Sequence, residues 1–232
     1  MKKIYYNPIF ARLFHTVVYC LQKQLLDCKS VLDLGCGPAS PLQYCKNIEF
    51  TVGVEAFKPY LIESRKKALH SEYRLAEIKD IDFPDKSFDA VIMIEVLEHL
   101  SKESGEKILK KAEKWAKKKI IVSTPNGYFY MKNVDENKWQ SHLSGWTIED
   151  FRENNFSVRG LAGVKFLYRD SNQVKSMVNQ DESNIYQNIR FRPKKFFYIL
   201  NSLFQILTYY FPRFSFELLA VKQLTKGKGE KE

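Results

Sequence analysis

Apolar positions along this chain follow two rhythms. Near the start they recur at steps of three and four, which predicts an amphipathic helix over residues 8–27. From residue 30 onwards, short apolar runs of strand length alternate with segments of helical spacing. The runs that predict strands are SVLDL, EFTVGVE, SEYRLAEI, SFDAVIMI, KIIVS, FSVRGLAG and FSFELLAVKQ. Alternating strands and helices indicate an α/β fold, with a mostly parallel sheet covered on both faces.

The alternation stops between about residues 163 and 192, where the sequence becomes polar and irregular. An almost wholly apolar segment follows, KKFFYILNSLFQILTYYFP, whose polar positions Asn201, Gln205 and Thr208 share one helical stripe. Two interpretations stay open: a lid or core helix, or a helix at a membrane interface with Lys194 and Lys195 among the headgroups. The chain has no apolar run of about 20 residues, so no membrane span is expected.

We therefore expect a single domain over residues 1–232. Its parts would be an N-terminal helix at 8–27, a core at 30–160, an insertion or lid at 163–211 and a final strand at 214–223. No repeat or linker divides the chain.

The first predicted strand breaks into a glycine-rich turn, VLDLGCGPAS. A dinucleotide fingerprint would place a third glycine three residues after Gly37, but Ser40 stands there, which disfavours an NAD-dependent oxidoreductase. Glu55 ends the second strand, 18 residues after Gly37. In this topology its carboxylate lies beside the first turn and can accept both hydroxyls of a ribose, from NAD or from S-adenosylmethionine.

The segments VLDLGCG, VGVEAF, DIDFPDKSFDAVIMIEVLEHL and IIVSTPNG occur in the order and spacing of class I S-adenosylmethionine-dependent methyltransferases, which this chain resembles over residues 30–160 and again at the last strand. The resemblance implies a Rossmann-like, doubly wound sheet of seven strands with an antiparallel last strand. Ala39, Ser40 and Glu77 depart mildly from the family pattern.

The same resemblance implies a cofactor site along the strand ends. It assigns the methionine and ribose part to the first turn, the ribose hydroxyls to the end of the second strand, the adenine to the end of the third, and the methionine end to the loop after the fourth. The residues, in that order, are Asp33, Gly35, Cys36 and Gly37; Glu55 and Ala56; Glu77 and Ile78; Ile94 and Glu95. Cys36 is expected to fill a small space rather than to react.

Two carboxylates and two imidazoles can gather beside that site. Glu95, Glu98 and His99 would share one side if the chain turns helically after the fourth strand, and His142 follows the neighbouring fifth strand. One interpretation is a divalent metal site for Mg²⁺ or Mn²⁺, as in the ubiquinone-biosynthesis O-methyltransferases and small-RNA 3′-end 2′-O-methyltransferases that the pattern resembles. His142 or His99 acting as a metal-free general base, and a purely structural cluster, are the alternatives.

Charge and cysteine content add little. The formal charge of +10 comes largely from lysines of one helix end and of the C-terminal tail, which favours a solvated surface over an attraction to nucleic acid, anionic lipid or phosphorylated substrates. Four cysteines without a paired spacing indicate reduced thiols, and the start MKKIYYNPIF has no signal-peptide pattern, so a cytoplasmic location is expected.

The sequence predicts a methyltransferase that uses S-adenosylmethionine to methylate an oxygen of a small-molecule or carrier-linked acceptor, such as a sugar, a quinone-like ring or a lipid-linked precursor. An RNA 2′-O-methyltransferase with a divalent metal and a catalytically inactive S-adenosylmethionine-binding module are the alternatives. The expected partner is thus a small or carrier-linked substrate, with nucleic acid less favoured and peripheral membrane contact open. The oligomeric state is not predicted.

Overall fold

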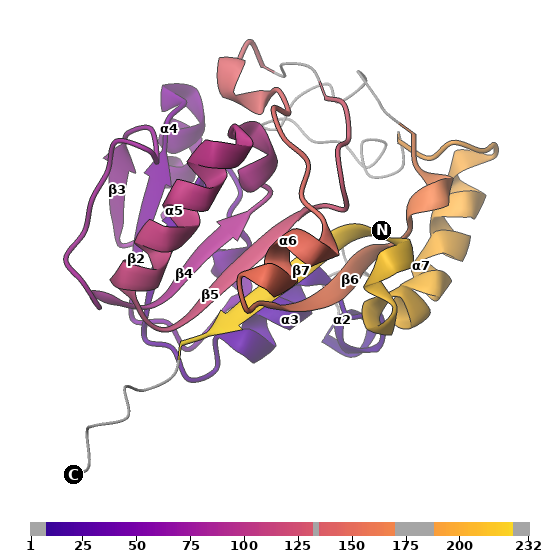
Figure 1. The fold of residues 1–232 in the computed structure, drawn as a ribbon, viewed down its shortest axis with the longest axis horizontal. Helices are drawn as coiled ribbons and strands as arrows, with labels where there is room; N and C mark the ends of the chain where they lie inside the picture. The colour runs from indigo at the N-terminus through magenta and orange to yellow at the C-terminus, as the bar shows by residue number, and fades with distance from the viewer. Residues whose placement is uncertain (1–7, 132–134, 170–187, 225–232) are drawn as a thin grey trace.

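One sheet of seven strands organises the protein (Figure 1). The computed structural model describes residues 8–131, 135–169 and 188–224. The strand order is β3-β2-β1-β4-β5-β7-β6, and β7 runs antiparallel to both of its neighbours while the other strands run in one direction. The predicted doubly wound sheet with an antiparallel last strand is confirmed. The strands are β1 (Ser30–Leu34), β2 (Phe50–Glu55), β3 (Glu72–Leu75), β4 (Phe88–Ile94), β5 (Ala116–Pro125), β6 (Ser157–Val164) and β7 (Ser215–Gln223).

The helices cover both faces, as near-continuous apolar strands require. They are α2 (Pro8–Leu13), α3 (Val17–Gln24), α4 (Lys58–Lys66), α5 (Lys102–Trp115), α6 (Ile148–Glu153) and α7 (Lys194–Tyr210). Successive residues of a strand point to opposite faces. Val91 and Met93 of β4 join the core beneath α5 and α6, whereas Ala90 and Ile92 join the core beneath α3. In Figure 1, α5 and α6 accordingly lie in front of the sheet and α3 behind it.

The expected single helix over residues 8–27 is instead two helices, α2 and α3. The chain breaks at His15, which has a positive φ of 48°, and restarts at Thr16, whose side-chain oxygen accepts a hydrogen bond from the Tyr19 amide. A cap of this kind competes with continued helix. The His15 ring also stacks on Tyr209 of α7 with centroids 4.0 Å apart, so a distant part of the chain holds the break in place.

The predicted insertion before β7 contains α7, which packs along the edge strand β6. Most of its polar stretch, residues 170–187, lies outside the described residues. Among the residues that the structure describes, no helix combines the length and apolar character needed to cross a bilayer.

Candidate functional site

The turn after β1 is shaped by two glycines with positive φ. Gly35 (φ +69°) lies against Val96, so a Cβ placed there would be 2.6 Å from a Val96 methyl group. A Cβ on Gly37 (φ +55°) would meet no atom nearer than 4.0 Å, so open space lies above this residue. The amides of Gly35 and Cys36 both donate to the Val54 carbonyl, which ties the turn to β2.

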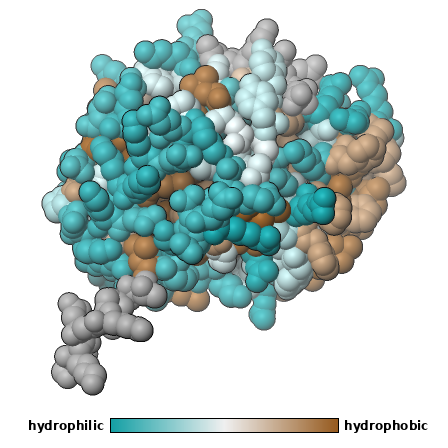
Figure 2. All heavy atoms as spheres, in the orientation of Figure 1, coloured by the Kyte–Doolittle hydropathy of each residue, from teal (hydrophilic) through white to brown (hydrophobic). Residues whose placement is uncertain are grey.

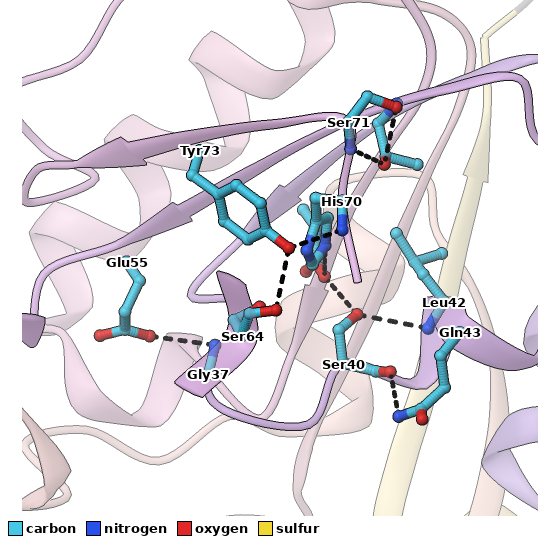
Figure 3. A network of polar contacts seen from close by, with 11 residues as sticks. Gly37, Ser40, Leu42, Gln43, Glu55, Ser64, His70, Ser71 and Tyr73 are labelled. Carbon is cyan, nitrogen blue, oxygen red and sulfur yellow. Dashed lines mark hydrogen bonds and ion pairs between the residues drawn. The ribbon is translucent and has the colours of Figure 1, made fainter. Parts of the chain in front are cut away.

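Glu55, at the end of β2, joins this turn to the start of α4. One carboxylate oxygen accepts a hydrogen bond from the Gly37 amide at 3.0 Å, as Figure 3 shows, and the other accepts from the Phe57 amide at 2.8 Å. Burial raises the pKa of Glu55, although the two amides act in the opposite direction. Each carboxylate oxygen has two lone pairs, so both retain capacity for hydroxyl donors.

Asp33 points into the protein rather than across the turn. It is 2% exposed, and its Oδ2 atom accepts from Ser40 Oγ at 2.5 Å and contacts His70 Nε2 at 2.9 Å. The network continues from the His70 amide to the Tyr73 hydroxyl, which donates to the Ser64 carbonyl of α4 (Figure 3). Asp33 therefore braces the turn from below. Sequence reasoning missed His70, which lies between α4 and β3 with no motif around it.

Cys36 is buried beneath the same turn. A Cβ on Gly53 of β2 would lie 3.0 Å from its sulfur and equally close to the His70 ring, so the Cys36 and His70 side chains fill the space over the Gly53 backbone. Burial, and then the carboxylates of Asp33 and Glu55, raise the pKa of the thiol. A thiol in this setting stays protonated and is a poor nucleophile.

The remaining predicted cofactor residues lie along the neighbouring strand ends. Glu77 follows β3, is partly exposed, and forms an ion pair with Lys79 at 2.8 Å, which lowers the pKa of Glu77. Ile78 beside it is buried, while Ala56 and Ile94 are partly buried at the ends of β2 and β4. The ring of Phe57 lies 6.4 Å from that of Trp139, in the short helix η3 (Lys138–Gln140). This edge thus combines an acid, a buried aliphatic and two aromatic rings.

Glu98, His99 and His142 form a second cluster. One ligand atom from each lies within 4.8 Å of the others. Glu98 and His99 belong to the short helix η2 (Leu97–His99), and the amides of Leu143 and Ser144 both donate to the Glu98 carbonyl, which draws the His142 segment in.

Each imidazole of the cluster is oriented by a backbone carbonyl. His142 Nδ1 lies 2.5 Å from the Phe129 oxygen and His99 Nδ1 lies 3.3 Å from the Ser141 oxygen. An Nδ1–H that donates to a carbonyl leaves Nε2 as the basic atom. Burial lowers the pKa of both, that of His99 to about 4 with a further contribution from His142, so both rings are neutral at pH 7.

The fourth predicted member, Glu95, lies beside this group and outside it. The expected helical turn after β4 begins only at Leu97 and leaves Glu95 out, because Glu95 has a left-handed φ of 56° and its amide donates to the Ser123 carbonyl of β5. Its carboxylate accepts from the Ser123 hydroxyl at 2.9 Å. Glu95 is therefore paired with β5 and acts on Glu98 from beside the ligand group.

The carboxylates in and beside this cluster are only partly hydrogen-bonded. One Glu98 oxygen accepts from the Thr124 hydroxyl at 3.0 Å, while the other is buried without a hydrogen-bond donor. Burial raises the pKa of Glu98 and of Glu95, and the proximity of Glu95 raises that of Glu98 further. Burial, and then Glu95, also raise the pKa of Glu217 on β7, an acid that sequence reasoning missed.

Comparisons with known proteins bear on the fold and on residues 32–123. A family model described as a methyltransferase domain matches residues 32–123. The (S)-coclaurine N-methyltransferase of Thalictrum flavum subsp. glaucum is 31% identical over 136 residues, which are 53% of this chain and 37% of that enzyme; the chain thus spans well under half of this curated relative.

Among solved structures, an S-adenosylmethionine-dependent methyltransferase from Archaeoglobus fulgidus matches with a TM-score of 0.52 and 18% identity, covering 93% of this chain and 98% of that one. A chain from a Haloferax volcanii complex that contains a methyltransferase activator matches with a TM-score of 0.53 and 15% identity, over 93% of this chain and 91% of that one. These two likenesses establish the fold. The family match marks residues 32–123 as similar to a methyltransferase domain.

Proposed function

We propose that this chain transfers a methyl group from S-adenosylmethionine to an oxygen of a small or carrier-linked acceptor. The observation that carries the proposal is the joined turn of β1 and β2, where a Glu55 carboxylate with spare lone pairs lies beside the open space above Gly37. When bound, the cofactor supplies a methyl group on a sulfonium, which is already activated for transfer.

The residues of the turn fit such a cofactor. Glu55 would accept the ribose hydroxyls, and Gly37 would let the ligand approach the backbone closely. Ile78, with Phe57 and Trp139 nearby, offers an apolar and aromatic edge for a purine, and Glu77 offers an acceptor for its amino group. Ile94 and Glu95 would border the methionine end.

Isothermal titration calorimetry tests this part of the proposal. The chain should bind S-adenosylmethionine and S-adenosylhomocysteine and should not bind NAD. Binding of NAD alone would overturn it. Incubation with a radiolabelled methyl donor and a panel of hydroxyl acceptors then separates an active transferase from a module that only binds the cofactor, because only the former labels an acceptor.

We further propose that Glu98, His99 and His142 hold a divalent cation such as Mg²⁺ or Mn²⁺. A buried Glu98 oxygen without a donor and two imidazoles oriented by backbone carbonyls are features of a divalent-metal ligand set, which supports this proposal. When bound, such an ion would lower the pKa of an acceptor hydroxyl and hold it near the methyl group. The neutral imidazoles, with the pKa of His99 near 4, favour ligation over unaided base catalysis.

The Thalictrum relative is an N-methyltransferase, which makes an amine the second candidate acceptor class. An amine acceptor in its neutral form needs no metal to ionise it. Labelling with hydroxyl and amine acceptors, each with and without EDTA, therefore separates the two. Metal-dependent labelling of a hydroxyl supports the oxygen proposal, and EDTA-insensitive labelling of amines alone contradicts it.

A further inference from the structure

Helix α7 is built with its polar side inward. The residues that it buries are Asn201, Gln205 and Thr208. Its outward stripe is apolar, and the side chains on it are between 39% and 58% exposed: Phe196, Ile199, Leu203, Phe204, Leu207 and Tyr210. Figure 2 shows this stripe as brown surface at the right edge, where Figure 1 places α7. An amphipathic helix of a soluble domain ordinarily has the reverse orientation.

The inversion has a cause in the sheet. β6 is an edge strand, and its pairing with β7 shifts register between Leu161 and Val164. The Asn201 side chain accepts from the Val164 amide at 2.6 Å and donates to the Ala162 carbonyl at 3.0 Å. Gln205 likewise accepts from the Gly163 amide and donates to the Gly160 carbonyl. The polar stripe of α7 therefore faces β6 to pair these peptide groups, and the apolar stripe on the opposite side of the helix faces away from the protein.

The apolar stripe continues past the helix. Phe211 and Phe214 follow it and Phe166 comes from the neighbouring short helix η4 (Lys165–Leu167), each with more than 60% of its surface exposed. We call this set, together with the outward residues of α7, the α7 face. Monomeric soluble proteins rarely expose a contiguous apolar surface of this kind without a partner for it.

Cationic residues border the α7 face. The sequence from Asn188 to Phe216 contains no aspartate or glutamate, and its charged residues are Arg190, Arg192, Lys194, Lys195 and Arg213. Partial burial, and then the guanidinium groups of Arg169 and Arg192, lower the pKa of Lys194, which shows that the cations at the start of α7 lie close together. A crowded cationic rim is stabilised by an anionic counterpart.

We propose that the α7 face docks on the surface of an anionic lipid bilayer, with the aromatic and aliphatic stripe in the interface and the arginine and lysine rim among the headgroups. A helix of 17 residues is about 25 Å long and would lie in the plane of the interface. A second copy of the chain fits less well. A two-fold interface through this face would bring two copies of the cationic segment 188–216, which contains no acid, against each other.

Vesicle co-sedimentation of the full chain tests the proposal without reference to methyl transfer. The chain should bind vesicles of phosphatidylcholine and phosphatidylglycerol at about 7:3, and bind pure phosphatidylcholine at least tenfold more weakly. The double variant Leu203→Gln/Leu207→Gln should lose roughly tenfold or more in partitioning, because two leucines no longer enter the interface. Lys195→Glu/Arg213→Glu should lose binding to the anionic vesicles to a similar degree.

The matched control is Leu26→Gln/Leu143→Gln, two leucines that are as exposed as those of α7 but lie elsewhere. It should partition like the wild type, and circular dichroism should show all variants folded. Failure of the wild type to bind either vesicle would overturn the proposal. The proposal would also be overturned if light scattering showed the wild type to be a dimer and Leu203→Gln/Leu207→Gln to be a monomer. The α7 face would then be the contact with a second copy.

Discussion

The two polar clusters at the strand ends differ in how their carboxylate oxygens are paired. Around the β1 turn, the Glu55 oxygens and the engaged Asp33 oxygen each meet donors of the protein itself. Around η2, a buried Glu98 oxygen has no donor, and two more acids lie nearby with raised pKa values. Carboxylates that are paired within the protein set a shape before any ligand arrives, whereas a buried carboxylate oxygen without a donor carries an energetic cost that a ligand can remove. The first cluster therefore suits a cofactor and the second an ion or an acceptor.

The largest effect is expected at the first cluster, from Gly35→Ala. The new Cβ would clash with Val96 and hold a non-glycine residue at φ +69°. We expect unfolding to become easier by roughly 2–4 kcal/mol, a fall in Tm of roughly 5–12 °C. Gly37→Ala is the matched control, because its Cβ enters open space. It should cost only about 1 kcal/mol of stability yet weaken S-adenosylhomocysteine binding about tenfold or more. Equal losses of stability in thermal melts would contradict the distinction.

Glu55→Ala should come next. Loss of the carboxylate removes the acceptor for ribose and frees the Gly37 and Phe57 amides, so affinity for S-adenosylhomocysteine should fall about 10- to 100-fold by calorimetry. Glu49→Ala, which changes an exposed glutamate paired with Lys29, is the control and should bind as the wild type does. An unchanged affinity in Glu55→Ala would remove the ribose assignment.

Glu98→Gln and His142→Ala address the second cluster. Each should lower the affinity for Mn²⁺ about 10- to 100-fold in a titration followed by paramagnetic resonance, and leave S-adenosylhomocysteine affinity within about twofold of the wild type. The exposed pair of Glu103 and Lys107 supplies the control Glu103→Gln. If the wild type itself binds neither Mn²⁺ nor Mg²⁺, the metal proposal is wrong. If the affinity for S-adenosylhomocysteine falls as much as the affinity for Mn²⁺, the two clusters do not bind their ligands independently.

The smallest effect is expected from Glu217→Gln. The pKa of Glu217 is raised in the folded protein, so its contribution to stability is greatest in acid and is lost as the pH rises through that pKa. Glutamine has no such dependence. At pH 8 the variant should melt about 2–4 °C higher than the wild type, the size of a ~1 kcal/mol change, and at pH 5 the difference should shrink. A Tm difference between variant and wild type that grows as the pH falls would contradict this pH dependence.

Local patterns account for what could be read from the sequence. The apolar runs, the glycine turn after β1 and the acid that ends β2 are each encoded within a few residues, and the confirmed sheet follows from them. His70 and Glu217 escaped because their partners Asp33 and Glu95 are distant in sequence. The helix break at His15 depends on Tyr209 for the same reason. Glu95 was misplaced because a left-handed residue before η2 has no signal in its side chain.

The polar stripe of α7 was predicted only in part. Asn201, Gln205 and Thr208 were recognisable as one side of a helix, but the sequence alone left open which side faces the protein. Hydrophobicity argues for the opposite burial. Only the unpaired backbone of β6 decides the orientation, and that backbone exists only once the sheet has formed.

The hydrogen bonds from Asn201 and Gln205 to β6 also bear on how this protein avoids self-association. An edge strand of eight residues is a template onto which the strand of another molecule can add. Here two side-chain amides occupy the peptide groups that such a strand would use. A chain carrying Leu in place of both amides would present that template uncovered, and it should aggregate through sheet extension rather than simply lose a helix.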